Sequence, residues 1–213
     1  MIRLHRSALA LLAWGTLASC GGGTTTTDMS AVTVDMTSAG TPSCTDYCAN
    51  IMANCNNAGS DAGVGATEQY TTLKNCMNSC KAFPVGTSAD TSGDTLGCRS
   101  YHAMAAKGDP KTHCPHAGPG GGGLCGTNCQ GYCQLAMLYC TSANMAKVYD
   151  TLADCMAVCA ATPDDVPPSI AVQDGKHVAC LLYHSQEASS DPPGHCIGDL
   201  MKVDGGANSI TCM

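Results

Sequence analysis

The chain has 213 residues, of which 17 are cysteine, while Phe, Trp and Tyr together make up only 4%. So few aromatic side chains exclude a large aromatic core, and the cysteine content indicates that cross-links supply part of the stabilisation. The net charge of −7 excludes the basic surface that binding to nucleic acid requires. Because 17 is odd, at least one cysteine has no disulfide partner within the chain.

The N-terminus has the order of basic, apolar and small residues that is typical of a secretion signal. Arg3 and Arg6 precede a short apolar run at residues 8–17, which leads into Leu17-Ala18-Ser19-Cys20. The run is too short to span a bilayer, which takes roughly 20 apolar residues. We therefore expect residues 1–19 to be a signal peptide that is removed after export.

The sequence Leu17-Ala18-Ser19-Cys20 resembles the lipobox of bacterial lipoproteins. The resemblance implies that Cys20 becomes the first residue of the mature chain and carries acyl chains such as palmitate. Two or three acyl chains attach a protein stably to a membrane, whereas one binds only marginally. Gly21 stands where the inner-membrane retention signal of this family has Asp, so the resemblance favours the outer membrane of a cell envelope. The alternative is an ordinary signal peptide whose cleavage site contains a cysteine.

Residues 20–41 are rich in Gly, Thr, Ser and Asp and have no helical or strand period. This composition is typical of a flexible tether. Loss of Arg3 and Arg6 with the signal leaves 8 Lys and Arg against 17 Asp and Glu, so anionic lipid headgroups would repel the mature chain. Membrane attachment would therefore depend on acyl chains at Cys20.

The sixteen cysteines after Cys20 form two sets of eight with nearly equal spacing, at offsets of 79 to 87 residues. Three other patterns recur with them. Tyr-x-Thr-Leu-x-x-Cys-Met-x-x-Cys begins at Tyr70 and Tyr149, Cys-x-x-Tyr-His at Cys98 and Cys180, and Asp-Pro-x-x-His-Cys at Asp109 and Asp191. The sequence therefore predicts a tandem duplication, with module 1 at residues 42–125 and module 2 at residues 126–213.

The cysteine spacing predicts two helices at the start of each module. Cys44, Cys48 and Cys55 lie on one helical stripe, and Cys76 and Cys80 repeat the four-residue spacing. If the two helices run antiparallel, the predicted disulfides are Cys44–Cys80, Cys48–Cys76, Cys129–Cys159 and Cys133–Cys155. This arrangement resembles the twin Cys-x3-Cys helical hairpins of small intermembrane-space proteins, and the resemblance implies architecture alone.

A third helix is expected from Cys98 to Lys107, because Gly108 suits a C-cap and Pro110 cannot continue a helix. Its counterpart would run from Cys180 to Ser189. The four remaining cysteines of each module allow three pairings. We favour Cys55–Cys98, Cys114–Cys125, Cys140–Cys180 and Cys196–Cys212. The expected fold is all-α, with two tandem disulfide-stapled helical modules after the tether.

Paired histidines are the candidates for chemistry. His102 lies four residues after Cys98, and the Asp-Pro turn at residue 109 could bring His113 toward it; His184 and His195 are the counterparts in module 2. Two imidazoles could bind a transition metal or ligate a haem. A zinc site usually needs three or four ligands, and only module 1 offers a third, His116, where module 2 has Ile197-Gly198.

The alternative is that these histidines are structural, packed against disulfides and bonded to backbone carbonyls of the Asp-Pro turn. Acid–base catalysis is a third possibility. Neither G-x-S-x-G nor H-E-x-x-H occurs, and the chain has only two glutamates, so we assign no catalytic residue. We expect a non-catalytic envelope protein, without a cofactor, that binds another envelope protein or a small ligand or has a structural role. Metal or haem binding by the histidines is the second hypothesis.

Overall fold

The computed structural model describes residues 40–56, 67–144, 147–196 and 212. The expected signal peptide, Cys20 and most of the expected tether lie outside the described residues. Those described form helices and turns without strands, which confirms the all-α prediction for this part of the chain. Within it, no helix is both long enough and apolar enough to cross a membrane.

The first copy contains four α-helices, α1 (Cys44–Cys55), α2 (Leu73–Cys80), α3 (Leu96–Ala105) and α4 (Pro110–Ala117), followed by a short 3-10 helix, η1 (Gly121–Gly123). Ser43, Thr72 and Thr95 precede the first three helices. Each hydroxyl accepts a hydrogen bond from the backbone N–H three residues later. These N-caps satisfy donors that the helix itself leaves unpaired.

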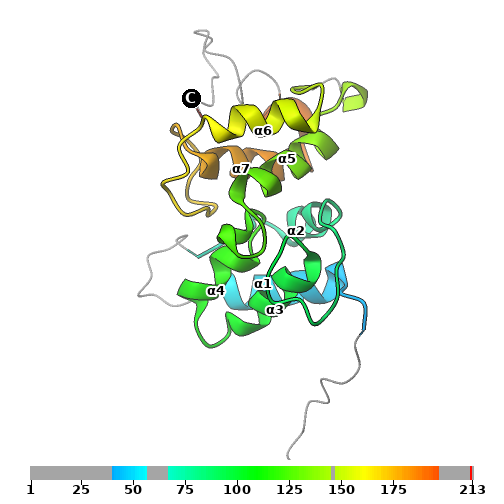
Figure 1. Ribbon diagram of the computed structural model, residues 1–213, viewed down its shortest axis with the longest axis vertical. Helices are drawn as coiled ribbons and strands as arrows, with labels where there is room; N and C mark the ends of the chain where they lie inside the picture. The colour runs from blue at the N-terminus through cyan, green and yellow to red at the C-terminus, as the bar shows by residue number, and fades with distance from the viewer. Residues whose placement is uncertain (1–39, 57–66, 145–146, 197–211, 213) are drawn as a thin grey trace, which may run out of the picture. The chain divides into compact units, whose positions relative to one another are not determined.

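The second copy repeats this order with α5 (Asn128–Tyr139), α6 (Leu152–Ala160), α7 (Val178–Glu187) and α8 (Pro192–Cys196); a 3-10 helix, η2 (Ser142–Asn144), follows α5. Thr127 and Thr151 form capping boxes with Gln130 and Asp154. In Figure 1, α5, α6 and α7 lie together in the upper half and α1, α3 and α4 in the lower half.

A helix after the third one was not predicted. We interpreted Asp109-Pro110 only as a stop, but the Asp109 carboxylate accepts a hydrogen bond from the backbone N–H of Thr112 and Pro110 is the first residue of α4. Proline suits this position because the N–H that it lacks would be unpaired there. Pro192 likewise begins α8. The third helices also lie two residues earlier than predicted, from Leu96 and from Val178.

Two disulfides join the Cys-x3-Cys helices of each copy. The Cα atoms of each pair lie 5.6 to 5.8 Å apart, within the usual range. The pairs are those that antiparallel helices predict: Cys44–Cys80, Cys48–Cys76, Cys129–Cys159 and Cys133–Cys155.

The other four predicted disulfides, Cys55–Cys98, Cys114–Cys125, Cys140–Cys180 and Cys196–Cys212, are wrong. The structure contains Cys55–Cys114, Cys98–Cys125, Cys140–Cys196 and Cys180–Cys212. The cause in the first copy is α4, which packs on α1 and places Cys114 at Cys55. The chain then returns to α3, where Gly93 N–H donates to the Leu124 carbonyl at 2.8 Å. Cys125 is therefore beside Cys98 and not beside Cys114.

A pair of tyrosines lies among the half-cystines in the core of each copy. Tyr47 donates a hydrogen bond to the Ala117 carbonyl at 2.7 Å, so the Tyr70 hydroxyl, 2.8 Å away, donates to Tyr47. The hydroxyls of Tyr132 and Tyr149 lie 2.7 Å apart in the same way. Burial raises the pKa of Tyr47 and Tyr132 far above the usual range. Because each hydroxyl is protonated and hydrogen-bonded, its burial in the core costs little free energy.

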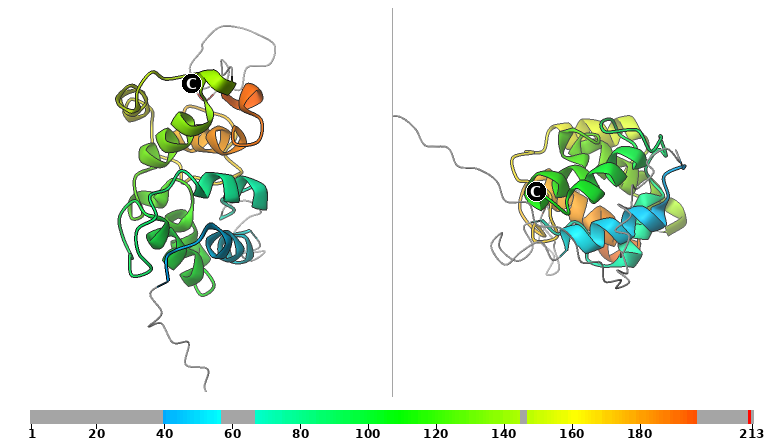
Figure 2. Two further views of the ribbon diagram at one scale, coloured as in Figure 1. Left: turned by 90° about the vertical axis from the view of Figure 1, so that its right-hand side faces the viewer. Right: turned by 90° about the horizontal axis from the view of Figure 1, so that it is seen from below.

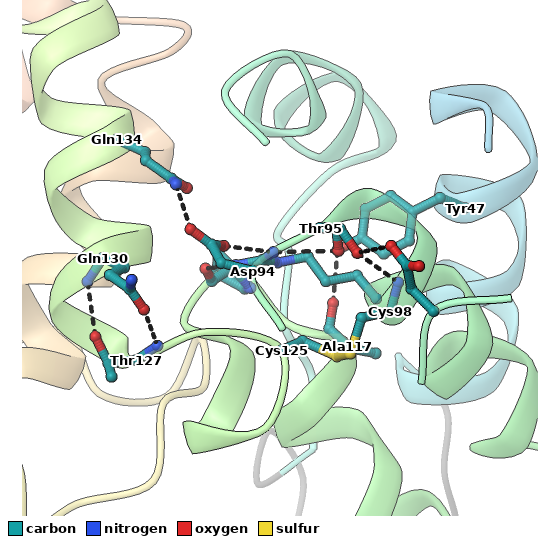
Figure 3. Close-up of polar contacts among 12 residues, drawn as sticks. Tyr47, Asp94, Thr95, Cys98, Ala117, Cys125, Thr127, Gln130 and Gln134 are labelled. Carbon is teal, nitrogen blue, oxygen red and sulfur yellow. Dashed lines mark hydrogen bonds and ion pairs between the residues drawn. A yellow bond between two sulfur atoms is a disulfide. The ribbon is translucent and has the colours of Figure 1, made fainter. Parts of the chain in front are cut away.

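The described residues belong to one unit, and an ion pair between a buried arginine and a partly exposed aspartate lies where the two copies meet. The fully buried Arg99 donates to Asp94 at 2.9 Å, and its guanidinium lies 4.0 Å from the centre of the Phe83 ring. Gln134 of α5 donates to the other oxygen of Asp94 (Figure 3). The second copy has Leu181 at the position of Arg99, so this pair belongs to the first copy alone.

We predict that the double variant Cys55→Ala/Cys114→Ala loses about 2 to 5 kcal/mol of unfolding free energy, because α4 is no longer tied to α1. Urea denaturation of the oxidised protein measures this loss. Peptide mapping of the unreduced wild type should yield a Cys55–Cys114 cross-link, and recovery of Cys55 linked to Cys98 would contradict the fold described above.

Candidate functional site

Two histidines from different helices meet in the first copy. His102 of α3 and His113 of α4 approach with their Nδ1 atoms 2.8 Å apart and their rings stacked at 5.1 Å. The Nε2 atom of His102 lies 3.2 Å from the carbonyl oxygen of Thr91. His113 therefore lies against His102, as the sequence predicts. It is positioned by the helix α4, which Asp109 caps, and not by a simple turn.

The Thr91 carbonyl determines where the protons lie. A carbonyl only accepts hydrogen bonds, so His102 carries its proton on Nε2 and has a lone pair on Nδ1. His113 must then donate from its own Nδ1. Burial lowers the pKa of His102 below the usual range; charge on His116 or His113 would lower it further, and the bond to Thr91 partly opposes this. His102 is therefore neutral at neutral pH, the form that ligates metals.

His116 lies one turn after His113 on α4. Its ring contacts His102 edge-on, with ring centres 4.9 Å apart. One nitrogen from each of the three histidines lies within 4.8 Å of the other two. The Nδ1 atom of His116 is buried and has no hydrogen-bond partner among the residues that the structure describes, and burial lowers the pKa of this side chain as well. The three imidazoles thus form one cluster, which we call the histidine triad.

A glycine in η1 permits close contact with the triad. Gly122 has a φ of +54°, and a side chain there would come within 3.0 Å of Cδ2 of His116. The left-handed conformation and the short distance both favour glycine. Gly122 is therefore packed directly against His116.

The second copy contains the same pair, and no third imidazole lies beside it among the described residues. His184 and His195 approach with Nδ1 atoms 3.0 Å apart, and His184 Nε2 lies 2.9 Å from the Gln173 carbonyl oxygen. Gly198 aligns with His116 in the sequence; it lies outside the described residues and has no side chain to offer.

The alternative that the histidines are structural residues packed against disulfides is correct in one respect. Cys98 and Cys125 lie close to His102, and Cys180 and Cys212 close to His184. Both cysteine pairs are disulfides, so their sulfurs are not thiolate ligands. The predicted bonds to carbonyls of the Asp-Pro turn are wrong, because the carbonyls come from Thr91 and Gln173. No sequence signal marks these two positions, since any residue offers a backbone carbonyl.

The geometry of the pairs does not fit axial ligation of a haem between them. Such ligation needs a macrocycle between the two nitrogens, whereas His102 and His113 are in direct hydrogen-bond contact. The same holds for His184 and His195. The three nitrogens of the triad lie close enough together to hold one small ion.

Surface hollows lie beside the triad and elsewhere on the described part of the chain. One, of about 440 Å³, is lined by Pro115, Gly122 and Asn128 together with residues 164–168, and so adjoins the triad. The other, of about 210 Å³, lies next to Tyr101 and Met104 of α3, whose side chains are exposed. Neither hollow contains a histidine of the triad.

The sequence matches the family model for the C-terminal domain of the BfoA family over residues 23–128. These residues include most of the expected tether and all of the first copy, with the triad; the second copy lies almost wholly beyond them. No solved structure matches the chain.

We predict that His113 carries its proton on Nδ1, and His102 on Nε2, in the metal-free protein. The Nε2 tautomer dominates for free histidine, so the assignment is diagnostic of the hydrogen bond between the pair. Long-range proton–nitrogen NMR correlations of labelled protein at pH 7.5 distinguish the tautomers, and His195 should match His113. Finding His113 protonated on Nε2 would contradict this assignment.

Proposed function

We propose that the protein is a lipid-anchored component of a bacterial outer membrane that binds a partner or supports structure, without catalysis. The observation that carries the proposal is the pairing of all sixteen cysteines from Cys44 to Cys212. Disulfides accumulate in oxidising compartments such as the periplasm. The pairing uses every cysteine except Cys20, which is the residue that a lipobox would acylate.

The side chains that recur in both copies form contacts within each copy, which supports a role in binding or structure. Residues that the two copies share are engaged inside each copy: Tyr47 and Tyr132 bond to a second tyrosine, and Thr72 and Thr151 cap helices. The ring nitrogens of His102 contact His113 and Thr91. The duplicated pattern is thus explained by folding, and no part of it needs a reaction to account for it.

The net charge of the chain bears on how it would attach to a membrane, and its surface hollows bear on what it would bind. The acidic chain would bind the membrane through acyl chains on Cys20, because anionic headgroups repel it. Its partner would be another envelope protein or a small ligand. The hollow beside Tyr101 and Met104 is a place where a small ligand would find both apolar and polar contacts.

We expect Cys20→Ser to abolish lipid attachment in a Gram-negative host. Wild-type protein should incorporate labelled palmitate and sediment with membranes, whereas the variant should remain an unlabelled precursor. Ser19→Ala, which keeps a small residue before the cysteine, is the matched control and should behave like wild type. Equal labelling of the Cys20→Ser variant would rule out lipidation at this residue.

We also expect Gly21→Asp to move the protein from the outer to the inner membrane, since Asp at this position is the retention signal of bacterial lipoproteins. Density-gradient fractionation of the two membranes measures the distribution. Gly21→Ser is the control and should remain in the outer-membrane fraction; an unchanged distribution of the Asp variant would contradict sorting by this residue.

A further inference from the structure

We propose that His102, His113 and His116 form a binding site for one divalent late first-row transition-metal ion, Cu²⁺ in preference to Zn²⁺, and that the second copy lacks this site. The proposal goes beyond the proposed function, because it concerns a site that lipid anchoring neither needs nor implies.

The donor set suits such an ion. Three imidazole nitrogens from neutral histidines are typical ligands of zinc and copper, and a given nitrogen site binds Cu²⁺ more tightly than Zn²⁺. The nearby sulfurs of Cys98 and Cys125 are in a disulfide. The triad therefore offers imidazole nitrogen and leaves one or more coordination positions to water.

The nitrogens need only small movements to converge on an ion. With metal–nitrogen bonds of 2.0 to 2.1 Å, tetrahedral ligands lie roughly 3.3 Å apart. The Nδ1 atoms of His102 and His113 are 2.8 Å apart, so they would separate by about half an ångström. His116 is already within 4.8 Å on the same helix as His113. A side-chain rotation in α4 can complete the site.

The hydrogen bond to Thr91 prepares His102 for this role. Metal-bound histidines usually donate the other ring N–H to a carbonyl or carboxylate, which holds the ring and fixes its tautomer. His102 donates Nε2–H to the Thr91 carbonyl and directs its Nδ1 lone pair toward His113. This bond is present before any ion binds.

The proton between the two rings is the atom that the ion replaces. In the metal-free protein His113 Nδ1–H donates to His102. When the ion binds, His113 loses this proton from Nδ1 and takes one up on Nε2, so the imidazole remains neutral and no proton is released overall. His113 and His116 are only half-buried, so solvent can exchange the proton and supply a water ligand.

Within the triad, His116 is the histidine that the repeat does not explain. The pair of His102 and His113 recurs as His184 and His195, with the same carbonyl contact, so folding alone can account for the pair. His116 does not recur, and its buried Nδ1 has no hydrogen-bond partner in the described part of the chain. A buried polar atom without a hydrogen bond costs free energy, and a bound ion would offset that cost.

The test is titration of the untagged full-length chain, oxidised and in detergent, with Cu²⁺ and separately with Zn²⁺, followed by calorimetry. We expect one strong site per chain, with Cu²⁺ binding more tightly. His116→Gln should weaken binding by roughly tenfold or more, whereas His195→Gln, which removes the counterpart of His113 in the second copy, should leave affinity unchanged. Circular dichroism and a free-thiol assay verify that both variants fold and keep their disulfides.

Electron paramagnetic resonance of the Cu²⁺-loaded chain gives a second readout, because each bound imidazole nitrogen splits the signal. Three nitrogens in wild type and two in His116→Gln would support the site. Absence of a strong site in wild type, or equal losses from His116→Gln and His195→Gln, would overturn the proposal. So would Zn²⁺ binding more tightly than Cu²⁺, or an unchanged nitrogen count in the His116→Gln variant.

Discussion

The disulfide between Cys55 and Cys114 is the constraint on which the first copy depends. It ties α4 to α1, and α4 carries His113, His116 and the Ala117 carbonyl that Tyr47 bonds. Once α4 lies there, the following chain returns to α3, where Cys125 meets Cys98. The disulfide Cys140–Cys196 places α8 in the second copy. A chain with few aromatic residues thus positions short helices by covalent links, because apolar area alone would hold them weakly.

Polar groups do part of the work that aromatic packing does in larger cores. Two tyrosine pairs bond hydroxyl to hydroxyl in buried surroundings. Arg99 lies wholly buried against Asp94 and Phe83, and Asp94 also accepts a bond from Gln134 of the second copy (Figure 3). The left view of Figure 2 shows α1 of the first copy below α7 of the second. Removing Asp94 would leave the buried Arg99 with an uncompensated charge, which usually costs more than an ion pair contributes. Arg99 lies on α3, the helix that carries His102 of the triad. Through Asp94 it therefore links this helix to the contact between the two copies.

The part of the fold that could be predicted is the part with local periodicity. Four-residue cysteine spacing predicts helices and, for antiparallel neighbours, the pairs such as Cys44–Cys80. The remaining pairs depend on where α4 lies, and the sequence describes α4 only through Asp109-Pro110, a signal that fits a helix start as well as a stop. The candidate site, too, was predictable in one part and not in another. The approach of His113 to His102 was predicted from the Asp-Pro turn between them, whereas the Thr91 carbonyl was not predictable, because backbone groups have no signature in the sequence.

By itself the sequence determined the all-helical class, the duplication, the antiparallel disulfides and the histidines that recur, because each depends on spacing along a single chain. Only the tertiary structure decided which of the remaining cysteines pair, which carbonyls hold His102 and His184, and that His116 joins His102 and His113 in one cluster. These outcomes depend on contacts between segments far apart in the sequence, and such contacts are selected by packing in three dimensions. The 17 cysteines illustrate the division: their number implies one outside the disulfides, and the fold pairs the other sixteen.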